Sequence, residues 1–300
     1  MELALGTVQF GLDYGISNQQ GQVPKSEVAQ ILLHAKSLGI NTLDCAGAYG
    51  NSEKVLGELQ ESEHFNLVSK IPALTPQQIS ILPFFEQSLV DLNRNKLDTL
   101  LFHQADNLLN HPNKEQIFSE ISQLKAQNLV KRIGISVYSP EQLKAISKQF
   151  TLDIVQAPIN IFDQRFISTD MLSLYQKSSL LIHARSLFLQ GLLLIEAEKL
   201  PPYFYPFKEE LSAFDKLAKY LSCSKLTLAL SVLAQDSHNK CIPINSVIDK
   251  IVVGVCNTEQ LIEMVNAYQQ AKKLSISIEE INLLADNRLE LINPSLWQVE

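Results

Sequence analysis

The sequence predicts a parallel (β/α)8 barrel. Eight short apolar runs alternate with amphipathic segments along its 300 residues, and 46% of these residues are hydrophobic, which is enough for one large core. Several of the runs end directly at polar, chemically reactive side chains. In a parallel barrel the C-terminal ends of all strands share one rim, so these side chains should converge there.

The eight predicted strands are short and rich in aliphatic residues. They are Leu3 to Val8, Ile40 to Leu43, Asn66 to Ser69, Thr99 to Phe102, Arg132 to Ser136, Ile154 to Ala157, Leu180 to Ala184 and Ile251 to Val255. Between them, apolar residues follow helical spacing, as in Val28, Ile31, Leu32, Ala35 and Leu38, and again in Ile79, Leu82, Phe85, Leu89 and Leu92. Eight such units favour a closed barrel over an open doubly wound sheet.

Local signals mark helix ends within this pattern. Ser26-Glu27 after Pro24 and Ser139-Pro140-Glu141 are typical helix starts, and Gly39 is a typical C-terminal cap. No GxGxxG or GxxxxGK[ST] motif occurs, which argues against a Rossmann site and a P-loop.

Two regions fall outside the repeating pattern. Glu196 to Lys208 is a long connection rich in proline and aromatic residues, which could be a substrate lid or packing over the barrel edge. Ile278 to Arg288 is predicted to form an extra helix, and Leu291 to Glu300 a tail with the only tryptophan, Trp297. No linker or low-complexity run divides the chain, so we expect one domain over residues 1–300.

Charge and cysteine content narrow the class of protein. The formal net charge of −7 argues against nucleic acid or an anionic membrane as the main partner, although a local basic pocket for a small anion stays possible. The four cysteines, Cys45, Cys223, Cys241 and Cys256, form no CxxC pair and no regular framework, which indicates free thiols in a reducing cytosol. The first residues do not resemble a signal peptide, and no run of eighteen apolar residues predicts a membrane span. We therefore expect a cytoplasmic protein.

Four reactive side chains stand at predicted strand ends. Asp44 and Tyr49 follow Ile40 to Leu43, Lys70 follows Phe65 to Ser69, and His103 follows Leu97 to Phe102. Each alone has an ordinary explanation: a loop cap, a rim aromatic, a solvated lysine or a packed histidine. All four in order predict a site for proton transfer to a carbonyl oxygen. Glu53 could belong to this site or simply begin a helix.

The chain resembles an aldo-keto reductase across nearly its full length. The matching pieces are Leu5-Gly6-Thr7, Asp44 through Gly57 (DxxxxYGxSExxLG), Lys70, His103, Arg132 to Ser136, Gln156 with Asn160, Arg185-Ser186 with Gly191, and Val253-Gly254 with Glu263. The resemblance implies a (β/α)8 barrel and reversible hydride transfer between NAD(P)H and a carbonyl. No metal is expected, because His64, His111, His183 and His238 show no metal spacing with one another.

The four side chains divide the proton chemistry among them. Hydride delivery to a carbonyl leaves an alkoxide that needs a proton. A free tyrosine, with a pKa of about 10, is a poor exchanger at neutral pH, and a nearby ammonium should lower that pKa. We assign Tyr49 as general acid/base, Lys70 as the group that modulates its pKa, and Asp44 as the partner of Lys70. His103 orients the carbonyl by a hydrogen bond, and a share in the proton transfer is its alternative role.

The resemblance also implies a set of cofactor contacts. Ser136 and Gln156, with Asn160 nearby, would line the nicotinamide. Ser186 and the backbone from Leu187 to Gly191 would meet the pyrophosphate. The adenosine end would be wrapped by Gly254 to Glu263, a segment that includes Cys256, Asn257, Gln260 and Glu263.

Three departures from the family pattern bear on the cofactor. Val137 replaces a common asparagine, and Arg185 stands where many members stack a tyrosine on the nicotinamide. Arg185 could stack there itself or bind an anionic group of the substrate or cofactor. Members that use NADPH usually place Lys or Arg in the eighth βα turn, whereas this turn reads Val255-Cys256-Asn257-Thr258-Glu259-Gln260, with Lys250 as the nearest cation. NAD and NADP both remain open.

The sequence thus predicts an NAD(P)-dependent carbonyl reductase. Gln9, Asp13 and Tyr14 suggest a small or sugar-like carbonyl substrate, by analogy with a bacterial subgroup associated with polysaccharide and sugar biosynthesis. We expect a monomer or a weak homo-oligomer. Two rival interpretations are a nucleotide-binding sensor barrel without turnover, and a Schiff-base lyase that uses Lys70.

Overall fold

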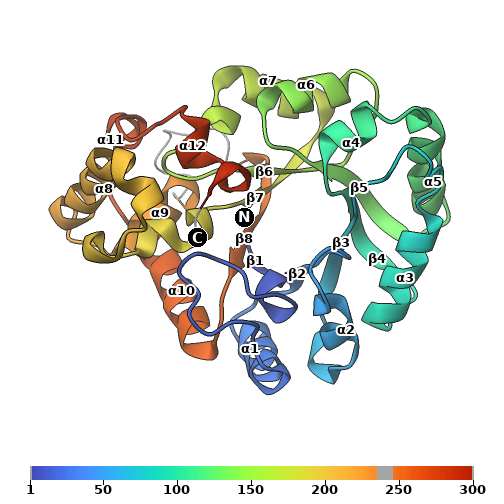
Figure 1. Cartoon of the computed structure of the whole chain (residues 1–300), viewed down its shortest axis with the longest axis horizontal. Coiled ribbons are helices and arrows are strands. Elements are labelled where there is room, and N and C mark those ends of the chain that lie inside the picture. The colour runs from blue at the N-terminus through green and yellow to red at the C-terminus, as the bar shows by residue number, and fades with distance from the viewer. Residues whose placement is uncertain (1, 235–245, 299–300) are drawn as a thin grey trace.

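Parallel pairing of the first and last strands closes the sheet. In the computed structural model, which describes residues 2–234 and 246–298, β1 pairs with β8 from Glu2 opposite Lys250 to Gly6 opposite Gly254. The strand order is β1 to β8 around a closed barrel, with helices packed around its outside (Figure 1). The predicted eight-stranded parallel barrel is confirmed. Cys241 and His238 lie outside the described residues.

The strands match the predicted apolar runs closely. They are β1 (Glu2–Gly6), β2 (Thr42–Asp44), β3 (Asn66–Ile71), β4 (Leu97–Phe102), β5 (Val130–Ser136), β6 (Ile154–Pro158), β7 (Leu181–Arg185) and β8 (Ile248–Gly254). The prediction that the first strand reaches Val8 is wrong. The amides of Phe10 and Gly11 donate to the carbonyls of Thr7 and Val8, which turns the chain into the 3₁₀ helix η1 (Val8–Phe10).

The helices follow the strands in the expected alternation. They are α1 (Lys25–Ser37), α2 (Ser52–Gly57), α3 (Leu82–Leu92), α4 (Ala105–Leu109), α5 (Lys114–Ala126), α6 (Pro140–Ser147), α7 (Thr169–Ser178), α8 (Lys208–Tyr220), α9 (Lys225–Ala234), α10 (Thr258–Ala271), α11 (Ile278–Asn282) and α12 (Leu289–Ile292). Short 3₁₀ helices connect them: η2 (Gln60–Ser62), η3 (Arg165–Ile167), η4 (Leu189–Leu194), η5 (Ala197–Lys199), η6 (Pro202–Phe207) and η8 (Pro294–Leu296).

The predicted helix signals act as expected at two places. Ser139 and Gln142 form a capping box at the start of α6. Gly39 follows α1 with φ +81°, a left-handed conformation that a glycine adopts without strain. Helix α3 begins only at Leu82, after Ile79 of the predicted pattern, because Glu120 accepts the amide of Ile81 and so supports a turn there.

Alternate strand residues point into the barrel or out toward the helices. A small apolar cluster of Val68, Leu101 and Ile154 is separate from the main core between the sheet and the helices. Near the amino ends of the strands, Arg132 Nη2 donates to Asp98 Oδ2 at 2.5 Å and Arg132 Nη1 to Asp249 Oδ2 at 2.6 Å. This ion-pair network lies at the end of the barrel opposite the predicted site.

The C-terminal part differs from its prediction. The extra helix, predicted to reach Arg288, ends at Asn282 as α11. The amide of Asp286 donates to the carbonyl of Phe162 and that of Arg288 to the Asp286 side chain, so neither continues the helix. Trp297 packs edge-on against Phe204 of η6, with ring centroids 4.8 Å apart. The aromatic segment therefore packs against the tail.

Candidate active site

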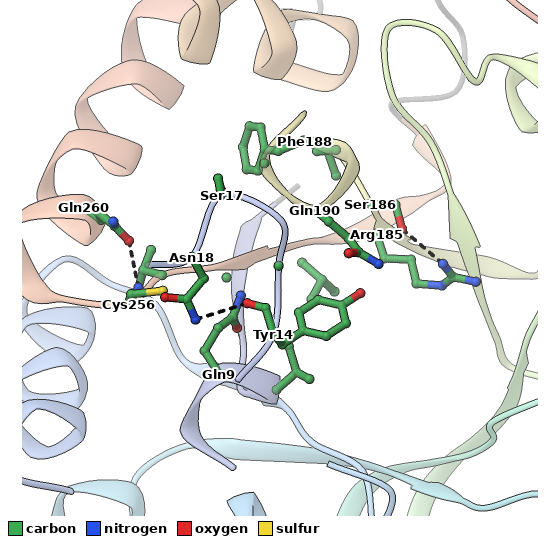
Figure 2. A pocket seen from close by; sticks show the side chains of 18 of the residues that line it. Gln9, Tyr14, Ser17, Asn18, Arg185, Ser186, Phe188, Gln190, Cys256 and Gln260 are labelled. Atoms are coloured by element: carbon green, nitrogen blue, oxygen red, sulfur yellow. Dashed lines mark hydrogen bonds between the residues drawn. The ribbon is translucent and has the colours of Figure 1, made fainter. Parts of the chain in front are cut away.

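A cavity of about 840 Å³ opens at the carboxyl ends of the strands. Its walls come from the loop after β1, the ends of β2 and β4 to β8, the loop after β7 and the start of α10. Figure 2 shows Gln9, Tyr14 and Asn18 from the loop after β1. They face Arg185 at the end of β7, and Phe188 and Gln190 in the loop that follows it. The aromatic residues of η6 are not among the residues that line this cavity.

The predicted acid, phenol and lysine meet at the floor of the cavity. Lys70 Nζ, on β3, donates to Asp44 Oδ2 at 2.8 Å, to the carbonyl of Cys45 at 2.7 Å and to the Tyr49 hydroxyl at 3.2 Å. The Lys70 side chain is fully buried and that of Asp44 is 5% exposed. The ammonium therefore donates to three oxygen atoms of the chain.

Electrostatics within this group keep Lys70 charged. Burial alone would lower the pKa of Lys70, but the charges of Asp44 and Tyr49 and their hydrogen bonds outweigh it and raise the pKa. A Schiff base requires a neutral amine as nucleophile. The environment of Lys70 works against that form and so against a lyase.

The pKa of Tyr49 moves opposite to the direction predicted from the sequence. Burial raises the pKa of Tyr49, and although Lys70 lowers it, the net direction is upward. The prediction considered the lysine alone and omitted the cost of desolvating a phenolate. Tyr49 is consequently a phenol that holds its proton until an acceptor takes it.

His103 lies beside this group as a neutral imidazole. Its ring meets the Tyr49 ring edge-on, with centroids 5.6 Å apart and planes at 81°. Burial, followed by the positive charge of Lys70, lowers the pKa of His103 to about 4. A neutral imidazole can donate one hydrogen bond into the cavity without bringing charge.

Backbone contacts fix the loop that carries Tyr49. Gly50 adopts φ +58°, and a Cβ there would lie 2.3 Å from the carbonyl oxygen of Gly11. A Cβ on Gly11 would lie 1.9 Å from the carbonyl oxygen of Tyr49. Ser52 Oγ adds a hydrogen bond of 2.8 Å to the carbonyl of Thr7. The first and second βα loops thus cross with no room for a side chain, a contact that the sequence analysis missed.

Glu53 supports the site from behind. It is buried in α2 and accepts hydrogen bonds from Ser69 Oγ at 2.5 Å and Ser88 Oγ at 2.9 Å. Its carboxyl therefore points toward β3 and α3 instead of serving as a solvent-exposed group at the helix start. Ser69 immediately precedes Lys70, so Glu53 links α2 to the strand that carries the lysine.

Most of the residues predicted for cofactor binding line the same cavity. They are Ser136, Gln156, Arg185, Ser186, Gly191, Gly254, Cys256, Gln260 and Glu263. Asn257 does not line it, because its side chain accepts the amide of Gln260 and caps α10. Asn160 also lies outside the lining and donates to the carbonyl of Ser186 at 3.2 Å. These two residues shape the walls from outside.

Arg185 adopts a conformation that no sequence pattern predicted. It donates to Ser186 Oγ at 3.1 Å (Figure 2) and to the carbonyl of Val137 at 3.0 Å. Its guanidinium lies 4.3 Å from the centroid of the Tyr138 ring. Lys250, considered as an alternative cation for the cofactor, instead pairs with Glu2 at 2.5 Å at the opposite end of β8. Lys250 is therefore ruled out as a ligand of this cavity.

Comparison with known proteins agrees with this geometry. A family model described as the aldo/keto reductase family matches residues 2–285. The chain belongs to the aldo/keto reductase family. It is 23% identical to an uncharacterized oxidoreductase, YqkF, of Bacillus subtilis over 94% of this chain and 91% of that protein. It is 26% identical to oxidoreductase YdhF of Escherichia coli over 58% of this chain and 63% of that protein.

Solved aldo-keto reductases share the fold. The holo form of AKR11C1 from Bacillus halodurans superposes with a TM-score of 0.69 at 19% identity, covering 95% of this chain and 92% of that one. An aldo/keto reductase from Klebsiella pneumoniae in complex with NADP and acetate gives a TM-score of 0.65 at 18% identity, covering 94% and 89%. As an aldo/keto reductase, the protein is an NAD(P)-dependent oxidoreductase of the carbonyl-reducing kind.

The residues present fit such a dinucleotide. The cavity volume lies within the range of about 300–1,000 Å³ common for ligand sites. Gln9 lines the cavity, and its side-chain amide lies next to Gly254. Its Oε1 atom is buried without a hydrogen-bond partner, so it is available to a polar group of a ligand. The described residues contain no cluster of three or more His, Cys, Asp or Glu placed to hold a metal.

Within residues 2–234 and 246–298, no single helix is both long enough and apolar enough to span a membrane. Only the bent pair Pro202–Tyr220 and Lys225–Ala234, taken together, passes that test.

Proposed function

We propose that this aldo/keto reductase reduces a small, sugar-like aldehyde or ketone, with Tyr49 as the proton donor. The observation that carries the proposal is the contact of Lys70 Nζ with Asp44, the Cys45 carbonyl and the Tyr49 hydroxyl at the cavity floor. When bound, NADH or NADPH supplies a hydride to the carbonyl carbon. Every other step uses groups of the chain itself.

Tyr49 donates its proton to the oxygen of the reduced carbonyl. Burial keeps the phenol protonated before the reaction, and the alkoxide is a much stronger base than phenolate, so transfer is downhill. The phenolate that remains lies 3.2 Å from the Lys70 ammonium, which stabilises it until a new proton arrives from solvent. Asp44 and the Cys45 carbonyl hold that ammonium in position.

His103 orients the substrate. As a neutral imidazole edge-on to Tyr49, it donates a hydrogen bond to the carbonyl oxygen and adds no charge that would compete with Lys70. The polar side chains of Gln9, Tyr14, Asn18 and Gln190 line the cavity and supply partners for several hydroxyl groups, which supports a polyhydroxylated substrate.

A Tyr49→Phe variant tests the proposal. With NADH or NADPH and a panel of small aldehydes and aldoses, wild type should turn over at least one compound. The variant should lose about 10²- to 10⁴-fold in kcat and keep its affinity for the dinucleotide. Tyr205→Phe, at a side chain 51% exposed on η6, is the matched control and should retain full activity. Unchanged turnover in Tyr49→Phe would refute the assignment.

One observation favours a second candidate, a nucleotide-binding sensor without turnover. Arg185 is held to Val137 and stacked on Tyr138, so no aromatic ring from this position faces the cavity. Turnover of any compound in the panel would eliminate the sensor. We also infer a cytoplasmic protein, because Cys45, Cys223 and Cys256 are unpaired thiols as expected in a reducing compartment, and we propose a monomer or weak homo-oligomer.

A further inference from the structure

The cavity has two chemically different ends. Tyr49 and His103 lie at one end, while Glu196, Ser224, Lys225, Gln260 and Glu263 line the other. A dinucleotide that reacts beside Tyr49 has to place its adenosine half toward the far end, if the proposed function holds. NADPH differs from NADH only by one phosphate on the adenosine ribose, so this end decides between them.

The N-terminus of α10 borders the far end and would normally attract a phosphate. Free N–H groups in the first helical turn, together with the helix dipole, bind anions. Here a carboxylate of the chain itself takes that place. Glu27 Oε1, on α1, accepts the amide of Thr258 at 2.8 Å and its hydroxyl at 2.9 Å.

Two neighbouring amides are also in use. The amide of Gln260 donates to Asn257 Oδ1 at 2.9 Å, and the amide of Cys256 donates to Gln260 Oε1 at 2.8 Å, the bond drawn at the edge of the cavity in Figure 2. A phosphate at this turn would have to break hydrogen bonds that the protein makes with itself. The turn thus offers little to an added anion.

The charges around this end are mostly negative. Glu196 and Glu263 line it, and Asp13 lies close enough to Cys256 that, after burial, its charge is the next cause of the raised pKa of that thiol. Among the lining residues in the described chain, Lys225 is the cation at this end. Its Nζ donates to the carbonyl of Ile195 at 2.8 Å and pairs with Asp215 at 3.2 Å, so most of its charge is already compensated.

We propose that this end of the cavity selects NADH over NADPH, with Glu27 as a specificity-determining residue that acts from behind the cavity wall: neither Glu27 nor Thr258 lines the cavity, and the Glu27 carboxylate compensates the first amide of α10. Glu263 supports the same choice, because a carboxylate accepts a hydrogen bond from a ribose 2′-hydroxyl but repels a 2′-phosphate. Cys256 leaves the turn without a cation that could compensate this repulsion.

Equilibrium binding measures the selectivity without any turnover. In calorimetric titrations at low salt, wild type should bind NADH at least about tenfold more tightly than NADPH, and 5′-ADP more tightly than 2′,5′-ADP. Glu27→Gln should narrow both ratios, and Cys256→Arg should narrow them further by adding a cation at the turn. Glu58→Gln, which removes an exposed carboxylate paired with Lys25, is the matched control and should leave the ratios unchanged.

The outcomes separate the two proposals. Equal or tighter binding of NADPH by wild type would contradict the proposed NADH selectivity but not the proposed carbonyl-reductase function. Binding of neither dinucleotide would overturn both. If Glu27→Gln fails to fold, Cys256→Arg still decides, because an unchanged ratio in that variant would show that the turn does not meet the 2′-position.

Discussion

Gln156 Nε2 donates a hydrogen bond of 2.7 Å to Asp44 Oδ1 across the barrel, from β6 to β2. With Lys70 on Oδ2, both oxygens of Asp44 are engaged. Gln156 was expected to contact the nicotinamide. Gln156 lines the cavity, but its side-chain amide also fixes the Asp44 carboxylate, which in turn positions Lys70. The orientation of the proton donor therefore depends on a residue from the far wall.

A Gln156→Leu variant should reveal this dependence. It leaves Asp44 Oδ1 buried without a partner, which costs about 1–3 kcal/mol of stability, and it loosens the position of Lys70. We expect a lower Tm, and a kcat that falls more than the affinity for the dinucleotide. Gln123→Leu, at an exposed position on α5, is the control. A loss of dinucleotide affinity with unchanged kcat would indicate a cofactor contact only.

His103 should stay neutral across the physiological range. Because burial and Lys70 lower its pKa to about 4, its imidazole should not titrate near the ordinary value of 6.5. Nitrogen-detected NMR of histidine-labelled protein should show one ring whose signals stay constant between about pH 5.5 and 8, and a His103→Gln variant should lack those signals. A His103 titration midpoint near 6.5 would contradict the proposed role as a neutral donor.

The ion-pair network at the closed end should set stability in acid. A hydrogen bond from His183, opposed by burial and reinforced by Arg132, holds the pKa of Asp249 well below its usual range. Its contribution is therefore complete above the unfolded value of 3.8 and is lost as the pH falls toward the folded pKa. Asp249→Asn should lower Tm clearly at about pH 7 and less at about pH 2.

An exposed carboxylate provides the comparison for that experiment. Glu86→Gln, on the surface of α3, should leave the Tm profile unchanged. Equal destabilisation of Asp249→Asn at both pH values would show that the carboxylate acts by packing and not through its charge.

Glu53 should respond to pH in the opposite sense. Burial raises the pKa of Glu53 despite the hydrogen bonds from Ser69 and Ser88, so the folded state favours the protonated form. Its effect on stability is most favourable below the unfolded value of 4.5 and declines as the pH rises toward the folded pKa. Glu53→Gln, which mimics the protonated group, should match or exceed the wild-type Tm at about pH 8. A large loss of Tm there would mean that the carboxylate is required in its charged form.

The barrel and the positions of Lys70 and His103 could be predicted from the sequence, because both depend on residues that are close together in the chain. Each strand is an apolar run, and Lys70 and His103 stand where such runs end. The contacts that complete the site are not local. Gln156 meets Asp44 across 112 positions, and Glu27 meets Thr258 across 231. The raised pKa of Tyr49 was also missed, because the depth of burial depends on the whole surrounding structure.

The crossing of Gly11 and Gly50 has a consequence for how the protein tolerates change. Neither glycine bears a reactive group, yet even a methyl at position 11 would collide with the backbone of Tyr49. Random mutagenesis screened for lost activity should therefore recover alanine and serine at positions 11 and 50. A naturally occurring variant at either position would be misjudged as harmless by anyone who looked only for loss of a functional side chain.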